Sequence, residues 1–214
     1  VHKPRVIYRE TIRNSRRLVG EFQRQVAGVP QSAKVELEME PFQGDEPIEV
    51  INRLGPADLA PGLQKVLEQS IRDGAQGAGL LGYPLIQVRF TIREVKLTEL
   101  ENPEAAVQAA ALDALHRGVS EDNLVLLEPI MRLEVTTPDE FLGNIHSDLM
   151  IRRALITGTE QRGDLQVIHA EAPLAAMFGY STHVRSLSQG RASYSMEPSR
   201  YAEAPAEVLR EMLG

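Results

Sequence analysis

Cysteine and tryptophan are both absent from the 214-residue sequence. Without cysteine the chain can form no disulfide, no thiolate metal site and no cysteine nucleophile. No apolar run approaches the ~18 residues of a membrane span, and the N-terminus has no signal-peptide pattern. The five histidines (His2, His116, His146, His169, His183) are not spaced as metal ligands. We therefore expect a cytoplasmic protein with no membrane contact and no metal site in this chain.

Nucleotide-binding loops are also lacking. The stretch "GAGLLG", Gly77 to Gly82, matches the dinucleotide glycine pattern, but it follows a predicted helix and precedes a predicted strand. That pattern binds phosphate only when it follows a strand and opens a helix. We interpret it as a helix end and a turn. No Gly-x4-Gly-Lys-Ser/Thr phosphate loop occurs, so this chain does not hydrolyse nucleotides by that route.

Catalytic constellations are missing as well. "HSD", His146 to Asp148, holds triad residue types, but neighbours on a helix cannot face one another. Carboxylates are plentiful, and no feature selects two of them as acid and base. The residues therefore favour a binding module over an enzyme. Val1 is not an initiator methionine, so we expect a piece of a longer chain.

Charge is unevenly distributed. The net charge is −7, yet Val1–Lys34 holds eight Lys or Arg against Glu10 and Glu21. Such a segment can form a basic face for phosphate. It can equally be a solvated strand face on which arginine stems cover apolar surface, and this second interpretation is favoured.

The first half mixes strands and helices. "KVELEME" alternates strictly, which predicts a half-buried antiparallel strand. Apolar spacing predicts a helix from Leu63 to Gly74, and Pro103 opens an alanine-rich helix over Glu104–His116. Further strands are predicted over Val6–Ile12, Leu18–Val26, Ile48–Ile51 and Leu85–Ile92. "VSEDN" after this helix is the best domain boundary.

The second half predicts a β-α-β-β-α-β order. A strand covers Leu126–Thr136, and Thr137 should cap a helix that begins at "TPDE". The other strands are Ala154–Thr159, Leu165–Ala170 and Ala192–Glu197, with a helix over Thr182–Gln189 and a tail helix over Ala206–Leu213. Tyr194 and Met196 should face the helices. This order is the ferredoxin-like split β-α-β.

Several strings, in order along nearly the whole chain, resemble the C-terminal part of translation elongation factor G. They are "YRETI", "GYP", "LLEPIM", "VTTPDEFLGNIHSDL", "RRALITGTEQRG", "APLAAMFGYSTHVRSLSQGRASYSME" and "YAEAP". The resemblance implies an α+β protein. Residues 1–123 would form a fourth domain similar to ribosomal protein S5 domain 2, and residues 124–214 a ferredoxin-like fifth domain with the tail helix.

The resemblance also implies partners. This portion would bind the ribosome as a monomer and contact rRNA, and tRNA and mRNA at the decoding site. The fragment itself would hold no cofactor. GTP and Mg would belong to a GTPase domain ahead of Val1, so that the full-length protein, and not this chain, would be the enzyme.

Two loops at the tip of the fourth domain contact RNA in the family. They correspond here to Gln25–Val35 and Arg93–Asn102, which should project together. The family's loop arginine is replaced by Val29, its tyrosine by Ser32 and the second loop's histidine by Thr98, while Pro30 stiffens the loop. Lys34 and Lys96 supply point charges instead. The candidate tip residues are Gly28, Val29, Pro30, Gln31, Ser32, Lys34, Lys96 and Thr98.

A second ribosome-facing surface is implied on the fifth domain, around Phe178–Tyr180 and the predicted helix Thr182–Gln189. Its candidates are Phe178, Gly179, Tyr180, His183, Arg185 and Arg191.

The favoured function is therefore tRNA and mRNA translocation, or a related ribosome function, by a translational GTPase. The lost tip residues and the acidic net charge keep an alternative open. In it, a divergent paralogue that does not translocate serves in ribosome recycling or protection, or as an interaction or regulatory protein.

Overall fold

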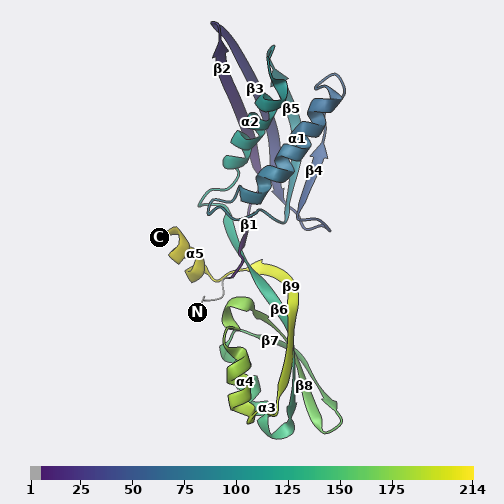
Figure 1. Ribbon diagram of the computed structural model, residues 1–214, viewed down its shortest axis with the longest axis vertical. Coiled ribbons are helices and arrows are strands. Elements are labelled where there is room, and N and C mark those ends of the chain that lie inside the picture. Colours follow the sequence, from purple (N-terminus) through teal and green to yellow (C-terminus); the bar gives the residue numbers. More distant parts are fainter. Residues whose placement is uncertain (1–5) are drawn as a thin grey trace. The chain divides into compact units, whose positions relative to one another are not determined.

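The computed structural model describes residues 6–214, which divide into two compact units (Figure 1). The N-terminal unit comprises Arg9–Leu126 and Pro205–Gly214. The C-terminal unit comprises residues 6–8 and Leu127–Ala204. The α+β class is confirmed, because each unit pairs one sheet with helices.

The N-terminal unit contains a four-stranded sheet in the order β2-β3-β5-β4. The pairs β2–β3 and β3–β5 are antiparallel, whereas β4 and β5 are parallel. Helix α1 connects the two parallel strands, as a parallel pair requires a crossover. The bounds are β1 Arg9–Ile12, β2 Arg16–Val26, β3 Val29–Pro41, β4 Ile48–Asn52, α1 Pro61–Gly74, β5 Val88–Leu97 and α2 Pro103–His116.

Helices α1 and α2 of this unit cover one face of its sheet (Figure 1). Along β3 the residues Val35, Leu37 and Met39 are fully buried, in agreement with the predicted alternation. Helix α2 lies unusually close to β2, because a Cβ added to Gly20 would stand 1.9 Å from the Ala110 carbonyl oxygen. An alanine-rich helix and a strand glycine thus allow close packing of a helix backbone on a strand backbone.

The C-terminal unit has the predicted β-α-β-β-α-β order. Its strands run β9-β6-β8-β7 and every neighbouring pair is antiparallel, which is the ferredoxin-like arrangement. Helices α3 and α4 bury Ile145, Leu149, Tyr180 and Val184 in its core. The bounds are β6 Leu124–Pro138, α3 Leu142–Ile151, β7 Leu155–Arg162, β8 Leu165–Pro173, α4 Tyr180–Ser188 and β9 Ser193–Glu203.

The predicted start of helix α3 is wrong. Thr137 pairs with Gln166 of β8 as part of strand β6, and its hydroxyl donates to the Pro138 carbonyl oxygen. A 3-10 turn over Asp139–Phe141 (η2) then leads into α3, without a side-chain cap. Thr137 therefore does not cap the helix, because its hydroxyl bonds to the Pro138 carbonyl oxygen and accepts no N–H from the first helical turn.

The end of the C-terminal unit departs from the sequence prediction in two further ways. Tyr194 packs against the core as expected, but Met196 is 36% exposed because β9 is an edge strand. The tail helix α5, Ala206–Leu213, groups with the N-terminal unit, and its Leu209 packs against that unit's core. The division of the chain into family domains at residues 1–123 and 124–214 remains a prediction.

Candidate nucleic-acid interface

Strands β2 and β3 are joined by a tight hairpin turn at one end of the N-terminal sheet. Val26 pairs with Val29, so that only Ala27 and Gly28 form the turn. Their φ angles are +50° and +80°, the left-handed values that type I′ hairpin turns require. Val29 is 60% exposed, and Pro30 is also exposed. The tip therefore presents a small apolar surface to solvent.

The second predicted tip segment lies directly beside the first. Thr98 donates its backbone N–H to the Ser32 carbonyl oxygen (3.0 Å), and its Oγ1 accepts the Ser32 backbone N–H (2.8 Å). Leu97 pairs with Ala33 at the end of β5. The expected adjacency of the two segments is present in the structure.

The expectation that both segments are loops is wrong in its detail. Residues 25–26 and 29–35 belong to β2 and β3, and residues 93–97 belong to β5. Pro30 is tolerated in a strand because its missing N–H lies beyond the last residue of β5, which ends its pairing with β3 at Ala33. The tip is stiff because it is a paired hairpin, and Pro30 adds to a rigidity that the pairing already supplies.

Two lysines face one another on the outer side of this sheet. Lys34 of β3 and Lys96 of β5 are direct cross-strand partners, and both are exposed. Lys96 Nζ lies 3.5 Å from a Glu94 carboxylate oxygen, which offsets part of the local charge. Like charges directly opposite are unfavourable unless an anion lies between them. The pair is therefore the clearest anion-binding feature of the tip.

Most of the remaining basic charge of this unit is neutralised. Arg16 donates to Asp122 (2.6 Å), and Arg17 pairs with Glu36. Arg93 donates to Glu38 at 2.6 Å, and this carboxylate raises the pKa of Arg93 further above its ordinary value. The interpretation of the N-terminal charges as a solvated strand face fits these contacts. Lys3 and Arg5 lie outside the described residues.

Helix α4 carries the candidate residues of the C-terminal unit. Phe178 and Arg185 are exposed, and Arg185 makes no ion pair with a described residue. Gly179 has a φ of +77° at the start of the helix. Arg191 pairs with Glu140 and lies 5.7 Å from the centre of the Phe141 ring. Because a local carboxylate already neutralises Arg191, Arg185 is the more available cation.

Tyr180 is buried on the core side of α4, whereas His183 is exposed and contacts α3. Tyr180 is 1% exposed and stacks edge-to-face on Tyr194 with ring centres 5.1 Å apart, so it cannot meet a macromolecule directly. His183 Nε2 lies 3.1 Å from Asp148, which also accepts from Arg152 (3.0 Å). This cluster ties α4 to α3, and Phe178, His183 and Arg185 remain as exposed candidates on the surface.

Glu10 is a buried carboxylate that the sequence analysis did not single out. It is fully buried in β1, and its carboxylate accepts backbone N–H groups from Leu81 (3.2 Å) and Tyr83 (3.0 Å). Burial raises its pKa, and the backbone donors oppose that rise. The "GAGLLG" stretch is thus a turn, as predicted, that binds a carboxylate of its own chain. Gly79 is required there, because a Cβ would lie 1.9 Å from the Glu10 carboxylate.

Metal-binding clusters and membrane-spanning helices are both missing from residues 6–214. No group of three or more His, Asp or Glu side chains in this range is placed to hold a metal ion. No helix in the same range has the length and apolar character needed to cross a bilayer.

The two units thus define a protein module with a projecting β-hairpin followed by a ferredoxin-like sandwich. Family models for elongation factor G match both halves: its domain IV over residues 4–121 and its C-terminus over residues 125–212. The chain therefore belongs to the elongation factor G family.

Individual relatives agree with this assignment. The chain is 39% identical to elongation factor G of Fervidobacterium nodosum and 40% identical to that of Thermotoga maritima, across its whole length. It spans 31% of the length of each of these relatives. A crystal structure of a Thermus thermophilus protein matches 98% of this chain and 31% of its own, with a TM-score of 0.88 and 34% identity.

Proposed function

We propose that this chain is the ribosome-binding portion of a translational GTPase that acts in tRNA and mRNA translocation or a related ribosome function. The hairpin tip would act at the decoding site and contact rRNA, tRNA and mRNA. GTP and Mg would bind in a preceding part of the full-length protein, which would be cytoplasmic and monomeric. The domains would follow the family's division into residues 1–123 and 124–214.

The observation that carries this proposal is the juxtaposition of Ser32 and Thr98. Two segments far apart in the sequence, both aligned with the family's RNA-contacting loops, are hydrogen-bonded at one end of a sheet. A stiff hairpin loses little conformational entropy on insertion into a narrow site. Lys34 and Lys96 place two ammonium groups behind the tip, where they can contact phosphate.

A sedimentation experiment tests the proposal. Full-length protein is centrifuged with ribosomes and a non-hydrolysable GTP analogue over a salt series. We expect co-sedimentation that weakens steeply as salt rises, because phosphate contacts release counterions. Protein that stays in the supernatant at low salt would refute ribosome binding.

The tip itself is tested by Val29→Arg with Thr98→His, which restores the donors usual in the family. We expect higher ribosome affinity or faster translocation, mainly at low salt, because the added guanidinium and imidazole can bind phosphate. The matched control is Leu165→Arg with Thr159→His on the β7–β8 hairpin, at exposed positions of the other unit. Equal increases in ribosome affinity or translocation rate for both double variants would mean that the effect comes from added charge anywhere on the surface, and not from the tip.

The apolar tip favours a second candidate function, a paralogue that does not translocate. Val29 exposes a branched apolar side chain where the family presents an arginine. Such a tip suits a protein contact, ribosome recycling or ribosome protection better than a grip on phosphate. A pull-down with full-length protein that recovers a non-ribosomal partner and no rRNA would support this candidate over the first.

A further inference from the structure

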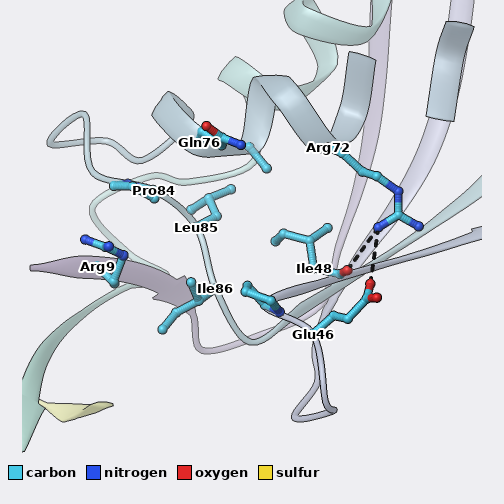
Figure 2. A pocket seen from close by; sticks show the side chains of 10 residues that line it. Arg9, Glu46, Ile48, Arg72, Gln76, Pro84, Leu85 and Ile86 are labelled. Carbon is cyan, nitrogen blue, oxygen red and sulfur yellow. Dashed lines mark hydrogen bonds and ion pairs between the residues drawn. The ribbon is translucent and has the colours of Figure 1, made fainter. Parts of the chain in front are cut away.

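The N-terminal unit contains a pocket of about 380 Å³ that is remote in sequence from both candidate interfaces (Figure 2). Its volume lies within the range of sites for small organic ligands. The floor is apolar and includes Ile48 at the start of β4, together with Leu85 and Ile86 ahead of β5. Pro47, Ala75 and Pro84 extend this apolar lining. An apolar part of a ligand, such as the face of a ring, can therefore pack against this floor.

Charged and polar groups stand at the rim. Figure 2 shows the guanidinium of Arg72 beside Glu46 and the side chain of Arg9 at the other end of the pocket. Arg72 Nη1 lies 3.4 Å from the Ile48 carbonyl oxygen and 3.6 Å from a Glu46 carboxylate oxygen. Both contacts are long, so a guanidinium with five N–H donors is held in place without being saturated. The charged residues of the lining are thus two arginines and one glutamate.

A competing anion is already present in Glu46, whose side chain is 74% exposed. Because it is so exposed, it can move into solvent when a better acceptor approaches Arg72. A phosphate offers more acceptor oxygens than a carboxylate and forms two parallel hydrogen bonds with a guanidinium. Gln76, also on the rim, can both donate to and accept from the edge of a heterocyclic ring.

The residue that follows the pocket floor in sequence has an unusual backbone conformation. Gln87, which follows Ile86, has a φ of +58°, a value that side-chain-bearing residues rarely adopt. Three hydrogen bonds maintain it: its N–H donates to Pro47, and its carbonyl oxygen accepts from Phe42 and from the Thr11 hydroxyl. Strained residues that are over-determined in this way cluster at ligand sites.

We propose that this pocket binds a mononucleotide unit, with its base on the apolar floor and its phosphate on Arg72. The ligand is recognised as a flat ring carrying a phosphate, and two sources present that chemistry: a free nucleotide and an unpaired nucleotide of RNA. The site lies apart from the hairpin tip, and free nucleotide binding does not depend on the proposed ribosome function.

The test uses amide NMR spectra of the full 214-residue chain titrated separately with AMP, adenosine, inorganic phosphate and a short single-stranded oligoadenylate. We expect AMP to shift the amides of Ile48, Ala75 and Leu85, with adenosine and phosphate each binding more weakly. If RNA is the natural source, the oligonucleotide binds more tightly than AMP and is displaced by it. If the free nucleotide is the source, AMP binds at least as tightly as the oligonucleotide.

Matched variants separate a built site from general charge. Arg72→Gln should weaken AMP binding by about tenfold, the loss expected for one charge-assisted contact. Lys65→Gln removes the same charge from an exposed position of the same helix and should leave binding unchanged. Glu46→Gln should tighten binding, a gain that misfolding cannot produce. Absence of shifts at millimolar AMP, or equal losses in Arg72→Gln and Lys65→Gln, would overturn the proposal.

Discussion

One buried polar side chain in each unit shows a contrast in hydrogen bonding. In the N-terminal unit the fully buried Glu10 carboxylate is surrounded by backbone donors from the Gly79–Tyr83 turn. In the C-terminal unit the Tyr180 hydroxyl is buried with no hydrogen-bond partner among the described residues. Burial raises the pKa of both groups. The Glu10 carboxylate is therefore held by specific polar contacts, whereas the packing around Tyr180 tolerates an orphaned hydroxyl.

The largest expected effect is on backbone packing in the N-terminal unit. Gly20→Ala should destabilise the chain by about 3 kcal/mol, because the new Cβ would collide with backbone atoms of Ala110 and Ala114. Gly143→Ala in α3 is the matched control, since a Cβ there meets no atom within 4 Å. Urea unfolding of both variants measures the contrast. Equal stability of the two variants would show that the helix does not approach the strand so closely.

The next effect concerns the buried carboxylate. Glu10→Leu should cost about 2 kcal/mol, because the N–H groups of Leu81 and Tyr83 lose their acceptor. Thr91→Val offers a control at a buried polar position whose side chain carries no charge. Chemical denaturation measures the free energy of unfolding of both variants. A similar decrease in both would mean that the loss comes from changing any buried polar side chain, and not from removing the acceptor of the two N–H groups.

Glu10 also predicts a pH dependence. Its pKa is raised in the folded chain, so the folded state binds the proton more tightly than the unfolded state. The stability that this group contributes is therefore full below the ordinary glutamate pKa and falls as pH rises through the raised folded value. Glu10→Gln should remove this component from the stability–pH profile. An unchanged profile between the ordinary glutamate pKa of ~4.3 and neutrality would contradict the assignment.

A smaller effect of opposite sign is expected in the C-terminal unit. Tyr180→Phe should stabilise the chain by up to about 1 kcal/mol, because it removes a buried hydroxyl that has no partner among the described residues. The edge-to-face contact with Tyr194 is retained in this variant. Thermal unfolding against the wild type gives the sign. A loss of stability would mean that the hydroxyl has a partner such as a bound water.

The smallest effects compare the two hairpin turns. Gly28 and Gly163 have φ angles of +80° and +64°, and neither has an atom within 4 Å of an added Cβ. Alanine at either position should cost about 1 kcal/mol through backbone strain alone. Asparagine should cost less, since it tolerates the left-handed region. Denaturation midpoints of the four variants check this ranking, and a larger loss at Gly28 would indicate a further contact at the tip.

Much of the fold was predictable from local patterns. The alternation of "KVELEME" indicated the buried face of β3, and Pro103 marked the first residue of α2. The β-α-β-β-α-β order followed from element lengths and turn residues. These features depend on residues near one another in the chain, for which local propensity and periodicity are sufficient evidence.

The candidate site was only partly predictable. The resemblance indicated that Gln25–Val35 and Arg93–Asn102 lie together, and the hydrogen bonds between Ser32 and Thr98 agree. It did not indicate a two-residue turn or the facing of Lys34 and Lys96, because strand register depends on cross-strand pairing. The burial of Tyr180 was not predicted either. In a helix as short as α4, the composition does not show which face packs against the core.

The sequence by itself determined the composition limits, the order of the elements and the family, because each depends on residue identity along the chain. Tertiary structure alone decided that "GAGLLG" binds Glu10, that Thr137 stays in a strand and that Leu209 of the tail helix packs against the N-terminal core. The physical reason is the same in each case. A buried group takes the partner that the folded chain brings within reach, and long-range packing outweighs a local preference worth about 1 kcal/mol.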